Sequence, residues 1–139
     1  LQFMVQLNRI ALHTQPQQEE SAVSNLVDQV LHYIGRHINE ELTLDGLAER
    51  FFVSKYHLSH AFSREVGISV YRYITIRRLM LARQLLTRGI PAGEVCYHSG
   101  FHDYAGFYRA FKAEYGISPR AFTDSAQQIK QEPTGKEPQ

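Results

Sequence analysis

The stretch Ser69-Val-Tyr-Arg-Tyr-Ile-Thr-Ile-Arg-Arg-Leu-Met-Leu-Ala-Arg-Gln-Leu-Leu-Thr-Arg-Gly89 decides the fold that we expect for this chain. It has no internal glycine or proline, begins with a serine suited to an N-cap, and ends at a glycine that is soon followed by Pro91. These are the start and stop signals of one long helix. Apolar residues lie almost all round its helical wheel, which is typical of a helix covered from several sides. We therefore predict a linker helix over residues 69–88, between two packed subdomains.

A helix-turn-helix pattern lies on each side of this predicted linker helix, over residues 43–67 and over residues 91–116. In both patterns, a short helix is followed by a tight turn, an N-cap residue, a second helix and a terminating glycine. An offset of 49 residues aligns Leu58, Ala61, Phe62, Glu65, Gly67, Ile68 and Ser69 with Phe107, Ala110, Phe111, Glu114, Gly116, Ile117 and Ser118. Six of these seven pairs are identical, so the two patterns form an internal repeat.

The remaining segments complete an all-α fold of about seven helices. Residues 21–39 have apolar side chains at three- and four-residue spacing, which predicts a first amphipathic helix, and Ser118-Pro119 begins a last short helix. We expect residues 21–124 to form one helical domain. Residues 1–20 are predicted to be a remnant and polar linker from an upstream sensor or dimerisation domain. Residues 125–139 are rich in Gln, Lys, Glu and Pro, which predicts a disordered tail.

Composition and charge exclude several classes of protein. The chain has no run of about 18 apolar residues, so we expect no membrane span. A single cysteine, Cys96, excludes an internal disulfide and favours a reducing, cytoplasmic compartment. The seven histidines lack the spacing of a zinc site, and we expect no metal and no cofactor. The net charge is only +1, but residues 55–88 hold seven Lys or Arg against one Glu. This basic segment is either a solvated surface or a footprint for a phosphate backbone.

Cys96 is the sharpest candidate for catalysis, as a nucleophile or methyl acceptor. It lies where the repeat places a small buried residue, and no Ser/His/Asp arrangement accompanies it. A free cysteine in such a position is commonly a buried small hydrophobic residue, so we do not expect an enzyme. The alternative to DNA binding is a helical protein-interaction module. Salt separates the two, because DNA affinity falls steeply with salt concentration.

Three motifs of the second pattern resemble a known family. Gly100-Phe101-His102-Asp103, Phe107-Tyr-Arg-Ala-Phe-Lys112 and Gly116-Ile-Ser-Pro119 are similar to the C-terminal signature of AraC/XylS-type bacterial transcription regulators. The resemblance covers roughly residues 22–123. It implies a seven-helix domain that binds double-stranded promoter DNA in a sequence-specific manner and acts with RNA polymerase, as an activator by family habit. It also implies that an effector ligand would act only through a missing N-terminal domain.

The recognition helix of each pattern should lay its N-terminal half in the major groove. The residues predicted to read bases are Tyr56, Ser59, His60, Tyr104, Ala105 and Arg109. The resemblance implies the three residues of the first helix, and outward positions indicate the three residues of the second. Arg109 is the strongest candidate, because a bidentate arginine on guanine is the commonest specific contact. The alternative for Arg109 is a surface ion pair with Glu114 or Asp103.

The sequence departs from the commoner family pattern at Ala105-Gly106 and at Cys96. Gly106 costs about 1 kcal/mol in a helix interior relative to alanine, so it indicates either close approach of the backbone to DNA or a position without contact. The lack of polar side chains at 105 and 106 favours reading through shape and phosphate anchoring in the second pattern. Residues predicted to contact phosphates, directly or through helix N-termini, are Lys55, Arg64, Arg72, Arg77, Arg78, Ser54 and Asp103.

The length of the linker helix suggests why it lies between the two patterns. About 19 residues in a helix span roughly 29 Å. Successive major-groove faces lie about 34 Å apart along the duplex. The linker helix is therefore predicted to hold two recognition helices about one turn of DNA apart.

Overall fold

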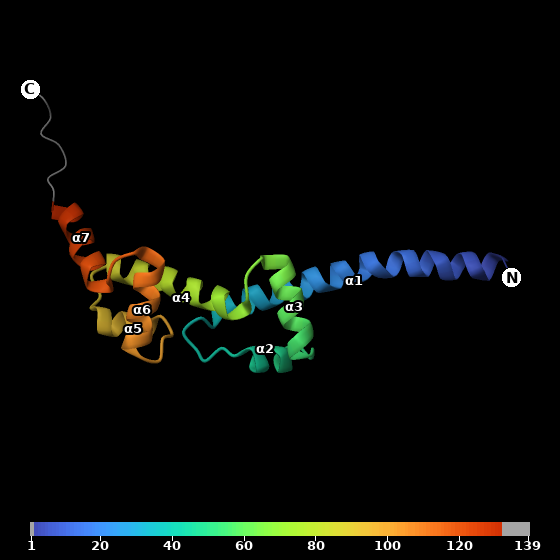
Figure 1. Ribbon diagram of the computed structural model, residues 1–139, viewed down its shortest axis with the longest axis horizontal. Coiled ribbons are helices and arrows are strands. Elements are labelled where there is room, and N and C mark those ends of the chain that lie inside the picture. Colours follow the sequence, from blue (N-terminus) through green and yellow to red (C-terminus); the bar gives the residue numbers. More distant parts are fainter. Residues whose placement is uncertain (1, 132–139) are drawn as a thin grey trace, which may run out of the picture. The chain divides into compact units, whose positions relative to one another are not determined.

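The computed structural model describes the backbone of residues 2–131 and the side chains of residues 17–130. Over this range it contains helices and no strand (Figure 1). The helices are α1 (Gln2–Arg36), α2 (Leu44–Arg50), α3 (Lys55–Val66), α4 (Val70–Thr87), α5 (Ala92–His98), α6 (Tyr104–Tyr115) and α7 (Pro119–Gln131). The predicted all-α fold, with two helix-turn-helix motifs joined by the long helix α4, is confirmed.

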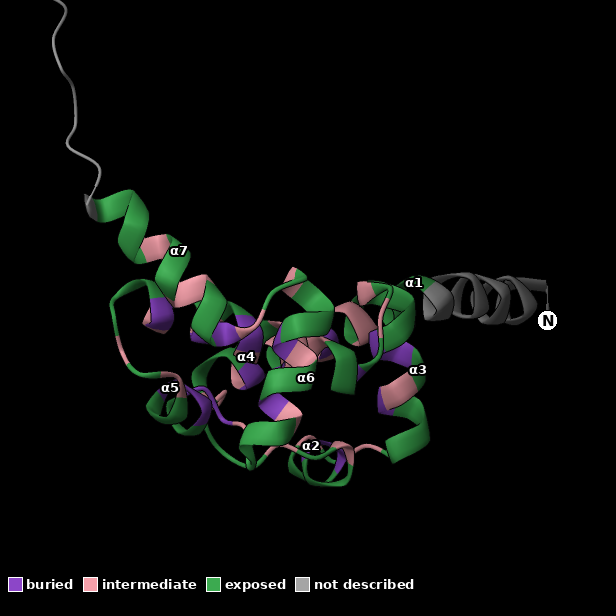
Figure 2. Ribbon diagram, turned by 60° about the vertical axis from the view of Figure 1, so that its left-hand side comes forward, coloured by how far each residue is buried: buried purple, intermediate pink, exposed green. Residues whose placement is uncertain are grey.

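The helices divide into two compact units. Unit 1 contains α1, α2, α3 and the first two residues of α4, and unit 2 contains the rest of α4 with α5, α6 and α7. The segment His37–Glu41, between α1 and α2, also belongs to unit 2. Each unit has its own buried residues, which lie on one side of each short helix (Figure 2). Those of unit 1 include Val27, Val30, Ile34, Leu47, Ala48, Leu58, Ala61 and Phe62.

The core of unit 2 forms between α4, α5 and α6. Its buried residues are Leu79, Ala82, Leu86, Val95, Cys96, Phe107 and Phe111. The Phe111 ring lies 5.8 Å from Phe107 and 5.7 Å from Phe122 of α7, centroid to centroid. Aromatic pairs at such distances stabilise a core beyond the burial of their surface. Cys96 is buried in this core, as the repeat predicts.

The ends of α3 and α6 follow from the same local signals. The hydroxyl of Ser54 accepts a hydrogen bond from His57 N–H, and the carboxylate of Asp103 accepts one from Gly106 N–H. Both helices end at a left-handed glycine, Gly67 with φ 87° and Gly116 with φ 78°. These caps fix where each helix begins, and therefore which side chains occupy its N-terminal half.

The turn between α5 and α6 packs closely against the segment that follows α1. Gly100 has φ 93°, and a Cβ at this position would clash with the carbonyl oxygen of Ile38 and lie 2.8 Å from Arg78 Nε. Arg78 of α4 donates from Nε to Ile38 O at 3.0 Å and from Nη2 to Glu40 O at 2.8 Å. Only glycine fits this turn, because it accepts positive φ and leaves room for the carbonyl.

The turn between α2 and α3 aligns with the turn between α5 and α6 at an offset of 48 residues, one less than the offset that aligns α3 with α6. It therefore contains a position equivalent to Gly100. Phe52 occupies it with φ 57°, and 95% of its surface is exposed. A non-glycine residue in this region is strained. The sequence does not indicate that Phe52 is exposed with a positive φ, because phenylalanine is usually a buried residue.

Two segments are more helical than the sequence predicts. Residues 14–20, predicted to be a polar linker, lie within α1, and residues 125–131, predicted to be disordered, lie within α7. Gln, Lys and Ala are good helix formers, so the polar composition of residues 125–131 did not interrupt α7. Lys130 Nζ also donates to Thr87 O at 2.6 Å, which holds the end of α7. Residues 132–139 of the predicted tail lie outside the described residues.

None of the helices in the described range has the length and apolar character needed to cross a membrane.

Gly100→Ala should lower the free energy of unfolding by at least about 2 kcal/mol, because alanine is penalised at positive φ and its Cβ meets a backbone carbonyl. Gly93→Ala in α5 is the matched control. Its Cβ would meet nothing within 4 Å, and better helix propensity should stabilise the chain by up to about 1 kcal/mol. Urea unfolding followed by circular dichroism measures both. Equal stability of the two variants would contradict this account of the turn.

Arg78→Met should cost about 2–3 kcal/mol of stability, because it leaves the carbonyls of Ile38 and Glu40 without their charged donor. Arg77→Met, next to it on the exposed side of α4, should change stability by less than about 0.5 kcal/mol. Thermal unfolding of the two variants gives the comparison. A small effect at both positions would show that the Arg78 hydrogen bonds contribute little.

Candidate nucleic-acid interface

The outward face of α3 is set by the residues that it buries. Leu58 and Phe62 are fully buried, so Tyr56 and His60 lie on the exposed side. Tyr56 is 73% exposed, and its ring centroid lies 4.1 Å from that of His60. Ser59, between them in sequence, is only half-buried. The three predicted base-reading residues of this helix therefore lie in its N-terminal half, with Tyr56 and His60 in contact.

A hollow of about 390 Å³ lies beside this face in unit 1. It is lined by His57, His60, Ser63 and Arg64 of α3, together with Ala61 and Val23. Arg64, predicted to contact phosphate, is exposed and has no ion pair among the described side chains. The polar and basic side chains that line the hollow can donate hydrogen bonds to an anion.

The outward face of α6 is set in the same way by Phe107 and Phe111, which are fully buried. Tyr104, Ala105 and Arg109, the predicted base-reading residues, are all exposed. Neither suggested partner of Arg109 is paired with it: Glu114 forms an ion pair with Arg72 at 2.7 Å, and Asp103 caps α6. Within residues 17–130, no ion pair holds Arg109, so its guanidinium is open to a ligand.

Tyr108 and Lys112 are two exposed residues of α6 that are not among the residues predicted to contact DNA. Tyr108 lies 49 residues after Ser59, so the repeat places it at an equivalent position, next to Arg109. Its ring lies 6.4 Å from that of Tyr104 and 6.0 Å from Lys112 Nζ. The repeat offset was the signal that could have identified Tyr108. These residues extend the exposed polar face of α6 along three turns.

The predicted phosphate contacts fall into three groups. Arg64 and Arg77 are exposed and form no ion pair in the described part of the chain. Lys55 and Arg72 are exposed but paired, Lys55 with Asp45 at 3.1 Å and Arg72 with Glu114. Exposed pairs of this kind are weak, so a phosphate can replace the carboxylate.

The third group is held by the protein itself. Arg78 is half-buried, and two of its N–H groups already bond to carbonyls. The side chains of Ser54 and Asp103 accept capping bonds, so only the N–H groups of the first turn of each helix remain to face an anion.

The chemistry of Cys96 does not suit a nucleophile. Burial raises the pKa of its thiol, and the negative charge of Asp103 raises it further. A thiol with a raised pKa stays protonated at neutral pH and reacts slowly. Within the side chains described, no group of three His, Cys, Asp or Glu residues is placed to hold a metal ion.

Comparison with known proteins gives the same motif. A family model described as a helix-turn-helix domain matches residues 47–125. The transcriptional activator AarP of Providencia stuartii is 30% identical over 100 residues, which cover 71% of this chain and 74% of AarP. The regulatory protein PocR of Salmonella typhimurium is 25% identical over 126 residues, and the match covers 84% of this chain. This chain spans only 42% of the length of PocR.

A solved structure shares the fold. The DNA-binding domain of AdpA, in complex with a target DNA, matches with a TM-score of 0.72 at 21% identity, over 77% of this chain and 97% of that domain. The family model covers more than half of the chain and includes both α3 and α6. By this match, by its likeness to AarP and by the motifs of its second helix-turn-helix, the chain belongs to the AraC/XylS-type family of helix-turn-helix transcription regulators.

Proposed function

We propose that this chain binds double-stranded promoter DNA with α3 and α6 as recognition helices in successive major grooves. The observation that carries the proposal is the repeated exposed face. In each helix, a fully buried pair of side chains four residues apart turns the N-terminal half outward. His60 in α3 and Arg109 in α6 are equivalent under the 49-residue offset, and both are exposed hydrogen-bond donors. The two helices thus offer different side chains on the same scaffold.

The length of α4 supports reading two grooves with one chain. Its 18 residues make a helix about 27 Å long. This is close to the roughly 34 Å between successive major grooves on one side of DNA. A continuous helix is a stiff spacer, so it would fix the register of one recognition helix against the other.

Each exposed residue has a task in the proposed complex. Arg109 reads a guanine, His60 and Ser59 read base edges in the other half-site, and Tyr56 and Ala105 contact thymine methyl groups. Phosphates are held by the exposed cations and by the first-turn N–H groups behind the two N-caps. The cations are Lys55, Arg64, Arg72 and Arg77.

The regulatory action follows from binding rather than from chemistry on the DNA. We propose that the bound chain contacts RNA polymerase and activates transcription, which the description of AarP as an activator favours. An upstream domain, joined through residues 1–20, would supply the effector signal. The protein would act in the cytoplasm, where promoter DNA lies, and would not be an enzyme.

Selection of bound DNA from a random pool tests the base contacts. Arg109→Ala should relax the preference at one position of one half-site, and His60→Ala at one position of the other, each with a loss of about 1–3 kcal/mol for the selected sequence. Arg36→Ala, which removes an exposed arginine outside both recognition helices, should leave the selected sequence unchanged. An unchanged preference in both test variants would rule out these assignments.

Salt dependence separates DNA binding from a protein-interaction module. Four phosphate-neutralising cations predict that log K for the selected duplex falls against log salt with a slope whose magnitude is at least about 3.6, because each contact contributes about 0.9. Fluorescence anisotropy at several salt concentrations measures the slope. A protein-interaction module would bind the duplex weakly or not at all, without a steep slope, and that result would overturn the proposal.

A further inference from the structure

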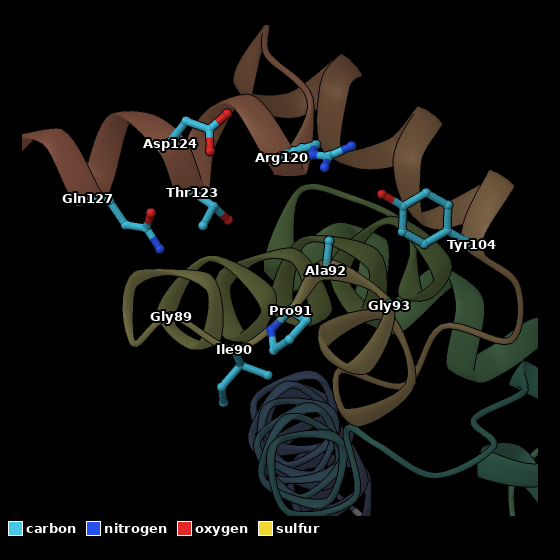
Figure 3. Close-up of a pocket in the computed structure, with 10 residues that line it drawn as sticks. All are labelled: Gly89, Ile90, Pro91, Ala92, Gly93, Tyr104, Arg120, Thr123, Asp124 and Gln127. Carbon is cyan, nitrogen blue, oxygen red and sulfur yellow. The ribbon is translucent and has the colours of Figure 1, made fainter.

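We infer that Tyr104 and Arg120 form a binding site for one phosphate of the DNA backbone, beside the groove that α6 enters. The inference rests on the proposed function of α6. The site is a cleft of about 450 Å³ within unit 2, where the beginnings of α5, α6 and α7 meet (Figure 3). Ala92 and Gly93 of α5, Tyr104 of α6 and Arg120 of α7 line it. It gives Arg120, which the sequence prediction passed over, a place at the interface.

The charge of Arg120 is unexplained by the fold. Arg120 is the second residue of α7, where a cation lies at the positive end of the helix dipole. The first turn of α7 contains no acidic residue, and the hydroxyl of Ser118 already accepts the N–H of Ala121. Arg120 is exposed and forms no ion pair among residues 17–130. A cation in this position is best explained by an anion that comes from outside the chain.

Gly93, on the same cleft, is also unexplained by packing. It is the second residue of α5, without a positive φ, and a Cβ at this position would meet nothing within 4 Å. Neither space nor backbone conformation therefore requires glycine at this position. A bare backbone does allow a large group such as a phosphate to approach closely.

Tyr104 connects the cleft to the recognition helix. The 49-residue offset makes it the equivalent of Lys55, a predicted phosphate contact of the first motif, and not of a base-reading position. In Figure 3 the Tyr104 ring lies on the Arg120 side of the cleft, and its hydroxyl can donate to an oxyanion. In helix-turn-helix proteins the first helix crosses the backbone while the second reads bases. The cleft lies at the beginnings of both elements, so a backbone phosphate that passes them can enter it.

One group on the cleft opposes an anion. Asp124 lies one turn after Arg120 on α7 and also lines the cleft. Asp124 is exposed and does not neutralise Arg120 through an ion pair. Its negative charge should weaken phosphate binding. Neutralising Asp124 should therefore have the opposite effect on affinity to neutralising Arg120.

The test measures the affinity of the full chain for a duplex carrying the sequence that the wild type selects. Arg120→Gln should lower affinity about three- to tenfold and reduce the salt slope by about 0.9, the value for one lost phosphate contact. Tyr104→Phe should lower affinity about two- to fivefold without changing the selected sequence, because a phosphate contact carries no sequence information. Asp124→Asn should raise affinity. Arg36→Gln is the control for loss of one positive charge elsewhere.

The results separate this inference from the proposed function. If Arg120→Gln has the same salt slope as the wild type, the phosphate site is overturned and DNA binding by α6 remains in place. An equal slope change in Arg36→Gln would also overturn it, since the effect would then be one of net charge. A changed base preference in Tyr104→Phe would return Tyr104 to base reading. No salt-dependent binding by the wild type would overturn both proposals.

Discussion

The arrangement of both recognition helices depends on one constraint, the burial of two large apolar side chains four residues apart. Leu58 with Phe62 in α3, and Phe107 with Phe111 in α6, are all fully buried. Residues four apart lie on one face of a helix, so burying this pair fixes the rotation of the helix about its own axis. The side chains at 56 and 60, or at 105 and 109, then point away from the core.

Helix caps fix where each of the two helices begins and ends. Ser54 and Asp103 set where each helix starts, and the left-handed glycines at 67 and 116 set where it stops. Because start, stop and rotation are fixed by residues that face inward or cap an end, the outward residues can vary without loss of the fold. The repeat shows this separation: its inward pairs are identical or similar, whereas Ser59 corresponds to Tyr108 and His60 to Arg109.

Most of the fold could be predicted from the sequence, because caps, glycine stops and apolar spacing are local signals. What could not be predicted depends on partners that have no local signal. Arg78 looks like a surface cation, but its acceptors are backbone carbonyls some forty residues away. Arg72 likewise forms an ion pair with a residue far away in the sequence, Glu114. Residues 125–131 are helical although their polar composition predicts disorder, because composition alone does not distinguish a solvated helix from a disordered tail. Tyr108 was recoverable, since the repeat offset places it beside Arg109.

The central claim is that α3 and α6 occupy successive major grooves on one side of the duplex. Chemical footprinting of the selected duplex, with interference by guanine methylation in the major groove and by phosphate ethylation on both strands, tests this directly. The account predicts two protected segments with centres about 10–10.5 base pairs apart on the same face of the DNA. A single protected segment, or two segments on opposite faces, would contradict it.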